Sequence, residues 1–319
     1  MNLDVLPLDA GELRPLVPQL LAVTEAGPLT REALATMRAT VPAFLPRPAA
    51  TPPWRWRAVP GSDGAPDVRV IVVDPGVTNG ALRPAILHLH GGGFVAGSAE
   101  ASLWRTQELA RELDCLVVSV EYRLAPETPY PGALQDSYAA LNWLFRSADE
   151  LAVDRDRIAV VGESAGGGHV ASLVVAARDS GDLPVRYQAL IYPMLDDRTG
   201  STVRKPAHMG AVLWNEQRNR FGWSCLLGHP AGSIEAAAGA VPARMLDLSG
   251  LPPTWIGVGS IDLFLDEDIE YARRLADAGV PVRLTVVPGA FHVFDAFGQL
   301  QIAQHFRADL IASLREALR

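Results

Sequence analysis

The sequence has few of the residues that mark several common classes of protein. It contains two cysteines, Cys115 and Cys225, so a disulfide framework is not expected and a reducing cytoplasm is the predicted location. Lysine is nearly absent and no basic cluster occurs, which argues against partners such as nucleic acid or an anionic membrane. No apolar run approaches the roughly 20 residues that span a bilayer. Residues 1–7 lack the basic and apolar regions of a signal peptide, so we expect a soluble protein.

The motifs of common metal and nucleotide sites are also missing. The sequence has no His/Cys spacing of a zinc site, no P-loop and no dinucleotide-binding Gly-x-Gly-x-x-Gly. We therefore predict no metal and no cofactor. The chain has 319 residues and a net charge of −8, with acidic and basic residues interspersed. That length allows a sizeable core in either two domains or one large α/β domain.

One pattern that is present organises the chain around Ser164. Residues 157–161 are apolar and rich in β-branched side chains, as in a buried strand, and residues 170–177 have the pattern of a buried helix. Between them, residues 162–166 read Gly-Glu-Ser-Ala-Gly. A Gly-x-Ser-x-Gly turn between a strand and a helix is typical of a nucleophile elbow. A serine hydroxyl is a poor nucleophile at neutral pH, so it needs a histidine base, an orienting acid and oxyanion donors.

Strands and helices alternate along most of the chain. Residues 54–59 and 68–73 predict an antiparallel hairpin, and further apolar runs predict additional strands. Because helical patterns separate these runs, we predict an α/β fold with an eight-stranded, mostly parallel sheet flanked by helices. The additional strands are expected at 85–90, 115–120, 157–161, 187–191, 254–258 and 283–287, and the helices near 103–113, 134–145, 170–177, 267–278 and 302–318.

Two stretches do not follow this alternation. Residues 196–246 contain prolines, glycines, Trp214 and Trp223 but no clear strand, as in a lid or cap insertion. Residues 1–48 have leucines at helical spacing, and a second helix is predicted to start at Thr30. We therefore predict an N-terminal cap segment (1–48), a cap insertion (196–246) and a catalytic domain made of residues 49–195 and 247–319.

A glycine run supplies the predicted oxyanion donors. His90 ends a buried strand and is followed by Gly91, Gly92 and Gly93. Consecutive glycines allow close backbone approach and dihedral angles that other residues avoid. An oxyanion hole needs N–H groups that point into a cavity. We expect these from Gly92, Gly93 and Ala165, with His90 anchoring the loop rather than transferring a proton.

The base and the acid are expected after the last two strands. His292 follows the last strand, and the chain order serine, acid, histidine is that of elbow-containing hydrolases. Asp262 lies nearest the end of the preceding strand and is the predicted acid. Asp266, Glu267 and Asp268 come where the next helix begins, and carboxylates there complement the helix dipole. The remaining histidines are interpreted as structural: His88, His169, His208, His229 and His305.

Together these motifs resemble the hormone-sensitive-lipase family of α/β-hydrolases, in its bacterial carboxylesterase branch. The resemblance implies an α/β-hydrolase fold with a helical cap, and members of that family often form homodimers. Where this chain has Glu163 the family usually has Asp, and Leu263-Phe264 replaces Pro-Leu. Residues 195–198 and 248–254 are similar to a bacterial acetyl-ester hydrolase. The stretches that carry the resemblance are 90–94, 121–127, 162–167, Asp262 with Asp266 and Glu267, and 292–294.

We therefore predict a serine carboxylesterase that hydrolyses small esters, with acyl groups from acetyl to hexanoyl, through an acyl-enzyme intermediate. One alternative is an amidase or peptidase with the same triad. Another is a non-catalytic ligand-binding receptor on the same fold, although the presence of His292 favours an enzyme. The predicted catalytic residues are Ser164, Asp262 and His292, the supporting residues are His90, Gly91 and Glu163, and the substrate-pocket residues are Phe94, Trp214 and Val293.

Overall fold

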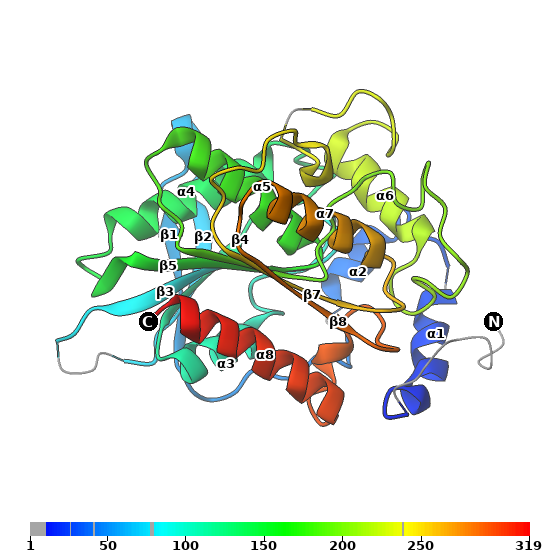
Figure 1. Cartoon of the computed structure of the whole chain (residues 1–319), viewed down its shortest axis with the longest axis horizontal. Helices are drawn as coiled ribbons and strands as arrows, with labels where there is room; N and C mark the ends of the chain where they lie inside the picture. The colour runs from blue at the N-terminus through cyan, green and yellow to red at the C-terminus, as the bar shows by residue number, and fades with distance from the viewer. Residues whose placement is uncertain (1–10, 26, 41, 77–79, 238) are drawn as a thin grey trace.

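An eight-stranded sheet runs through the centre of the computed structural model, which describes residues 11–25, 27–40, 42–76, 80–237 and 239–319 (Figure 1). Its strands are β1 (Trp54–Val59), β2 (Val68–Val73), β3 (Arg83–Leu89), β4 (Leu116–Glu121), β5 (Val153–Glu163), β6 (Tyr187–Ile191), β7 (Thr254–Gly259) and β8 (Val282–Val287). They lie in the order β1-β2-β4-β3-β5-β6-β7-β8. The β1/β2 and β2/β4 pairs are antiparallel, and the other pairs are parallel. The predicted α/β fold with an eight-stranded, mostly parallel sheet is confirmed.

Helices cover both faces of this sheet. On one face, α4 (Gly132–Arg146), α5 (Ala165–Ser180) and α7 (Leu265–Asp277) contribute to one buried apolar cluster. On the other, α3 (Leu103–Leu113) and α8 (Gln301–Ala317) contribute to a second. Figure 1 shows the first group above the sheet and the second group below it. Short 3-10 helices are η3 (Ser62–Gly64), η4 (Pro242–Arg244) and η5 (Phe294–Ala296).

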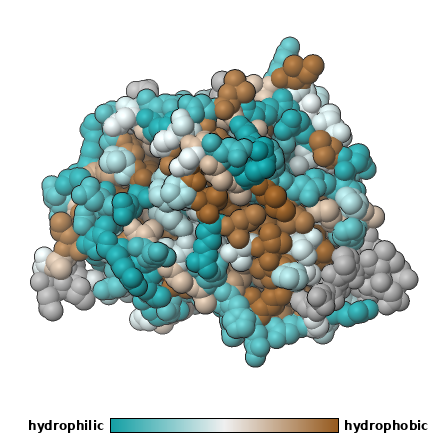
Figure 2. Space-filling model, in the orientation of Figure 1, coloured by the Kyte–Doolittle hydropathy of each residue, from teal (hydrophilic) through white to brown (hydrophobic). Residues whose placement is uncertain are grey.

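Apolar side chains also reach the surface at the edge of the sheet. Figure 2 shows a band of them on the face where β8 lies. β8 is the last strand of the sheet, and its Val286 is 39% exposed. Within the described part of the chain, no helix combines the length and the apolar character needed to cross a membrane.

β5 carries the chain to the candidate nucleophile. Residues 158–161 of this strand are fully buried, and they pair in parallel register with β3 and β6. A strand covered by helices on both faces is apolar throughout, which explains the run seen in the sequence. The strand extends beyond the predicted residues 157–161 because its first and last residues also pair with its neighbours.

The first described helices of the N-terminal segment pack against one face of the sheet. Residues 1–10, 26 and 41 of the predicted segment 1–48 lie outside the described residues, and so does the stretch 1–7 considered for a signal peptide. After η2 (Arg14–Leu16), α1 (Val17–Glu25) joins the same apolar cluster as α3 and α8. The expected leucine face is present, since Leu13, Leu20 and Leu21 are buried and Leu16 is half-buried.

A second group of helices lies over the loops that follow β3 and β5. It consists of α2 (Leu34–Ala39) and α6 (Glu216–Leu227), which lie at the same end of the molecule in Figure 1. Their apolar residues form a third buried cluster, which includes Phe94. α2 starts later than was predicted from Thr30, because residues 31–33 form a turn instead of the first helical turn.

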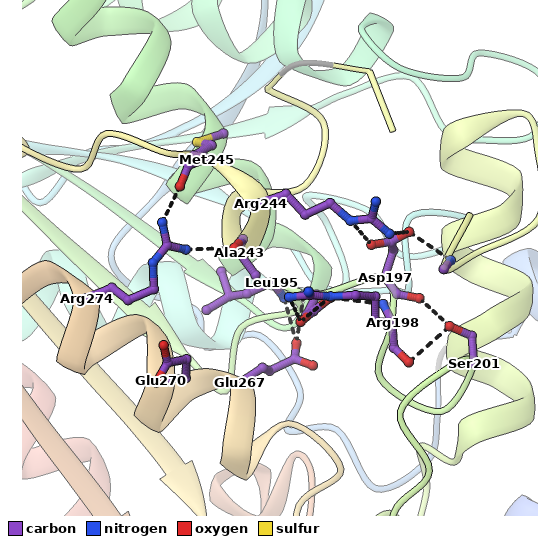
Figure 3. A network of polar contacts seen from close by, with 12 residues as sticks. Leu195, Asp197, Arg198, Ser201, Ala243, Arg244, Met245, Glu267, Glu270 and Arg274 are labelled. Atoms are coloured by element: carbon purple, nitrogen blue, oxygen red, sulfur yellow. Dashed lines mark hydrogen bonds and ion pairs between the residues drawn. The ribbon is translucent and has the colours of Figure 1, made fainter. Parts of the chain in front are cut away.

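The two ends of the insertion 196–246 meet at its base, as Figure 3 shows. Near its start, the carboxylate of Asp197 accepts two hydrogen bonds from Arg244 near its end, each of 2.8 Å. Arg274 of α7 donates a hydrogen bond of 2.7 Å to the carbonyl oxygen of Ala243 in the same stretch. These contacts fasten the insertion to the helix that begins just after the candidate acid.

Candidate active site

Ser164 lies at a sharp turn between β5 and α5. Its backbone has φ 54° and ψ −119°, which residues other than glycine rarely adopt. The Ser164 N–H donates to the carbonyl oxygen of Ile191 (2.8 Å), and the Ser164 carbonyl accepts from the Met194 N–H (2.9 Å). A Cβ on Gly162 would overlap the backbone of Gly166, which explains the glycine at the start of the motif. The turn therefore presents the serine hydroxyl at the end of the strand.

Ser164, His292 and Asp262 form one hydrogen-bonded row. Nε2 of His292 lies 2.9 Å from Oγ of Ser164, and Nδ1 of His292 lies 2.8 Å from Oδ2 of Asp262. The other oxygen of Asp262 accepts a hydrogen bond of 3.1 Å from the N–H of Phe264. Ser164 is 5% exposed, His292 3% and Asp262 0%. A carboxylate at Nδ1 orients the ring so that Nε2 can accept the proton of the hydroxyl.

Backbone contacts between two loops bring the acid and the histidine together. β7 and β8 are parallel neighbours, so their loops leave the same edge of the sheet. Beyond the strands, the N–H of Ser260 donates to the carbonyl oxygen of Val287 (2.9 Å). The N–H of Ile261 likewise donates to the carbonyl oxygen of Ala290 (3.1 Å). The pairing of the strands thus continues up to the residues of the row.

The other carboxylates near the acid lie in different surroundings. Asp266, Glu267 and Asp268 all lie in the first turn of α7, where the sequence placed them. Asp266 is exposed and forms an ion pair of 2.6 Å with Lys205. Glu267 and Asp268 are buried instead, which the sequence did not predict, and burial raises the pKa of both carboxyl groups well above the usual range.

The glycine run after β3 has dihedral angles that favour glycine. Gly92 and Gly93 have φ values of 137° and 61°. A Cβ on Gly92 would overlap the carbonyl group of Ala96, and a Cβ on Gly93 would overlap the ring of Trp214. The carbonyl oxygen of Gly92 accepts hydrogen bonds from the N–H groups of Val95 (3.2 Å) and Ala96 (3.0 Å). We call residues 91–95 the oxyanion loop, after the role that the sequence predicts for Gly92 and Gly93.

His90 and Gly91 lie at the start of this loop, beside the serine. A Cβ on Gly91 would lie 3.5 Å from the Cβ of Ser164, so the oxyanion loop passes close to the elbow. Nδ1 of His90 lies 2.9 Å from the carbonyl oxygen of Gly91, and its ring stacks on Tyr122 with 4.1 Å between centroids. Burial lowers the pKa of His90 to about 4, so the ring is neutral at pH 7.

Glu163 belongs to a buried polar network that the sequence did not reveal. Its carboxylate contacts Nε2 of His88 (2.8 Å) and accepts a hydrogen bond from Ser102 (2.9 Å), and Nε of Arg105 lies 3.9 Å away. Burial opposes ionisation, but His88 and Arg105 outweigh it and lower the pKa of Glu163 to about 2. Arg105 also donates to Asp295 (2.5 Å). We call His88, Ser102, Arg105, Glu163 and Asp295 the elbow network.

Tyr192 connects the elbow network to the histidine of the row. Its hydroxyl donates to Asp295 (2.7 Å), and its ring meets the His292 ring edge-on with 4.7 Å between centroids. Asp295 comes shortly after His292 in the chain, which is a weak sequence signal for its position. Arg105 and Tyr192 lie in no recognised motif, so no sequence signal could have found them.

Of the residues predicted for the substrate pocket, Trp214 lies near His292 and Val293 follows it in the chain, whereas Phe94 packs in the third apolar cluster. Phe94 is 2% exposed, and its ring packs edge-on against Trp223 with 4.7 Å between centroids. The ring of Trp214 lies 6.5 Å from that of His292, measured between centroids. Val293 is half-buried and has φ 64°. Aromatic side chains from the oxyanion loop and from residues 196–246 therefore share one buried cluster with Ala165, the residue that follows the serine.

Residue types that bind metals or form disulfides are dispersed. Cys115 and Cys225 are both free and buried. Over the described ranges, no three His, Cys, Asp or Glu side chains are grouped as metal ligands would be. The polar groups that face one another at the site are those of Ser164, His292 and Asp262.

Comparison with known proteins shows the family to which the chain belongs. Residues 86–296, which contain Ser164, Asp262 and His292, match a family described as having the alpha/beta hydrolase fold. The chain belongs to this α/β-hydrolase family. The resemblance to its hormone-sensitive-lipase-like members, which the motifs indicated, is therefore confirmed.

Relatives of this α/β-hydrolase are named as ester hydrolases. Esterase LipI of Mycobacterium tuberculosis is 37% identical over 208 residues, which are 64% of this chain and 63% of LipI, so the match spans just under two thirds of that relative. Ethyl acetate hydrolase of Pseudomonas putida is 34% identical over 242 residues, 71% of this chain and 70% of that protein. The solved structure of a bacterial heroin esterase is 36% identical with a TM-score of 0.82, and the match covers 96% of this chain and 99% of that one.

Proposed function

We propose that this α/β-hydrolase is a serine carboxylesterase that cleaves small esters, with acyl groups from acetyl to hexanoyl, through an acyl-enzyme intermediate. The coarser class, a carboxylic ester hydrolase, follows from the family and from the esterases among its relatives. The observation that carries the proposal is the hydrogen-bonded row of Ser164, His292 and Asp262 next to the oxyanion loop.

In the proposed first step, Oγ of Ser164 attacks the carbonyl carbon of the ester. Nε2 of His292 takes the hydroxyl proton, and Asp262 holds the ring and stabilises the imidazolium that forms. The imidazolium then donates its proton to the leaving alcohol, which leaves the acyl group on Ser164. In the second step, His292 takes a proton from water and the hydroxide attacks the acyl carbon. The bond between that carbon and Oγ of Ser164 then breaks, the imidazolium returns its proton to Oγ, and the carboxylic acid is released.

We assign the developing oxyanion to the N–H groups of Gly92, Gly93 and Ala165. Ala165 is the first residue of α5, a helix of 16 residues whose N-terminal end carries positive dipole charge. Backbone donors that are held in place before the reaction need no reorganisation during it, and loss of a single donor costs about 10²–10³-fold in kcat.

The limit on acyl length is supported by the aromatic residues around the row. Phe94, Trp214 and Trp223 share a buried cluster with Ala165 beside Ser164, and such bulky side chains would leave little room for a long acyl chain. One relative is named for ethyl acetate, an acetyl ester. In this proposal, residues 1–48 and 196–246 are the cap over a catalytic domain of residues 49–195 and 247–319. A homodimer and a cytoplasmic location stay predictions.

Covalent labelling tests the role of Ser164. A fluorophosphonate should label one serine in the wild type. Ser164→Ala should abolish labelling and lower kcat by roughly 10⁴-fold or more, because the nucleophile is lost. Ser180→Ala, at the far end of α5, is a matched control that should change neither. Labelling that survives Ser164→Ala would show that another residue is the nucleophile.

A substrate series tests the ester class and the acyl length. We expect kcat/KM for p-nitrophenyl esters to be higher from acetyl to hexanoyl than for dodecanoyl and longer chains. Faster cleavage of matched p-nitroanilides would favour the amidase alternative. Binding without turnover of any ester or anilide would favour the receptor alternative. A preference for emulsified long-chain triglyceride would contradict the proposed acyl limit.

A further inference from the structure

The oxyanion loop has a backbone conformation that needs support from outside. Gly92, Gly93 and Phe94 all have positive φ, at 137°, 61° and 68°. For a residue with a side chain such as Phe94 this region is unfavourable, so the surrounding structure must impose it. One contact does so directly, because the N–H of Ala125 donates to the carbonyl oxygen of Phe94 (3.0 Å).

Arg38 of α2 supplies the next contacts along the loop. Its Nε donates to the carbonyl oxygen of Val95 (2.7 Å), and its Nη2 donates to the carbonyl oxygen of Ala125 (2.9 Å). The carboxylate of Glu127 accepts from Nη1 (2.9 Å) and Nη2 (2.7 Å) of the same guanidinium group. A planar guanidinium presents its donors in a fixed fork. Arg38 therefore joins the end of the oxyanion loop to the segment that holds the Phe94 carbonyl.

Arg38 acts through the geometry of its hydrogen bonds rather than through the stability of its ion pair. The side chains of Arg38 and Glu127 are 28% and 62% exposed, so their ion pair contributes little stability by itself. The hydrogen bond from Arg38 does lower the pKa of the Glu127 carboxyl group, which stays ionised and orients the guanidinium. Leu34 of α2 is buried in the same apolar cluster as Phe94, so the helix that carries Arg38 is itself seated against the loop.

We propose that Arg38 is a positioning residue for the oxyanion loop, one that fixes the N–H groups of Gly92 and Gly93 by holding the carbonyl of Val95. This inference rests on the proposed function, because it assumes that the loop binds an oxyanion. A displacement of about 1 Å at a reacting centre can cost about 100-fold in rate. Since charge develops on the carbonyl oxygen only in the transition state, loss of Arg38 lowers kcat more than it raises KM.

Arg178 offers a matched control for this role. Its Nη1 donates to the carbonyl oxygens of Asp247 (3.1 Å) and Ser249 (2.8 Å), and it pairs with Asp179. Its side chain is 22% exposed, close to the exposure of Arg38. The two arginines therefore make the same kinds of contact, but only Arg38 contacts the oxyanion loop.

The experiment compares Arg38→Ala, Arg38→Lys and Arg178→Ala. It measures kcat and KM for p-nitrophenyl acetate, the inhibition constant of a trifluoromethyl ketone that forms a tetrahedral adduct, and the melting temperature. We expect Arg38→Ala to lower kcat at least about tenfold while KM stays within about threefold of the wild type. The inhibition constant of the ketone should rise by a factor similar to the loss in kcat. Arg38→Lys should have a smaller effect, because an ammonium group lacks the fork. Arg178→Ala should leave kcat unchanged.

Each outcome bears on one claim. A folded Arg38→Ala variant with kcat within twofold of the wild type, or with a loss equal to that of Arg178→Ala, overturns the positioning role. If Arg38→Ala does not fold, Arg38→Lys decides: a lower kcat at an unchanged melting temperature supports the role, and an unchanged kcat overturns it. Wild-type turnover that does not depend on Ser164 would instead defeat the proposed function itself.

Discussion

Buried carboxylates on the two sides of the Ser164–His292–Asp262 row differ in whether their oxygens have hydrogen-bonding partners. In the elbow network, both oxygens of Glu163 and both oxygens of Asp295 have a hydrogen-bonding partner. At the start of α7, Asp268 is fully buried, and neither of its oxygens has a partner within the described residues. Burial near the row therefore does not by itself identify a functional acid.

The same contrast appears in the ionisation of these groups. The charges around Glu163 overcome its burial and lower its pKa to about 2. For Asp268, burial is joined by the negative charges of Glu267 and Asp262, and together they raise its pKa well above the usual range. One side of the row thus holds paired charges, and the other holds a carboxyl group whose surroundings raise its pKa.

The largest effect is expected from exchanging Asp262 for its amide. Asp262→Asn keeps the shape of the side chain but favours the wrong tautomer of His292, so activity should fall roughly 10⁴-fold in a folded protein. Asp266→Asn removes an exposed helix-start carboxylate, which is worth about 0.3–1 kcal/mol of stability, and activity should stay within about tenfold of the wild type. The measurement is kcat/KM for a p-nitrophenyl ester, with circular dichroism to check the fold. A reversed order would make Asp266 the acid.

A smaller but substantial effect is expected when an ion pair of the elbow network is removed. Asp295→Asn leaves the buried Arg105 without its closest counter-charge, and removal of one partner of a buried ion pair costs about 3–5 kcal/mol. Urea unfolding measures this loss. Glu150→Gln is the control, because Glu150 forms its ion pair with Arg57 while 62% exposed. Its removal should cost less than about 1 kcal/mol. Equal losses for the two variants would contradict the importance of the elbow network.

The smallest effect is expected from replacing Asp268, and it is a gain in stability. Asp268→Ala removes two buried oxygens without partners, so the free energy of unfolding should rise by about 1 kcal/mol or more. The folded protein binds the Asp268 proton more tightly than the unfolded chain does, so this residue makes stability fall as pH rises above about 4. The stabilisation should therefore be larger at pH 8 than at pH 4, as measured by urea unfolding at both values.

The control for this last variant is an exposed acid of the same helix. Asp277 lies at the end of α7 and is 62% exposed, so Asp277→Ala should not change the pH dependence of stability. Loss of stability in Asp268→Ala at pH 8 would mean that Asp268 has a partner that compensates its burial.

Much of the candidate site could be predicted because its residues lie in motifs with local consequences. Gly92 and Gly93 have positive φ, and a Cβ on Gly162 or Gly92 would overlap the backbone only four residues further along the chain. The positions of Asp262 and His292 follow from the order of strands, since parallel strands end at one edge of the sheet. Arg38 and Arg105 could not be found in this way, because their partners Val95 and Asp295 are 57 and 190 residues away in the chain.

By itself, the sequence determined the strands of the sheet, the helices that alternate with them and the serine at the turn, because hydrophobic period and glycine conformation are local properties. It did not reveal α6, which lies in the stretch without a clear pattern. Only the tertiary structure decided which carboxylates are paired, which carboxyl groups have a raised pKa and which arginine contacts the loop after β3. The physical reason is that desolvation and hydrogen bonding depend on groups that meet only when distant segments pack together. Asp266 and Asp268 are near neighbours in the sequence, yet one is exposed with a lysine partner and the other is buried with none within the described residues.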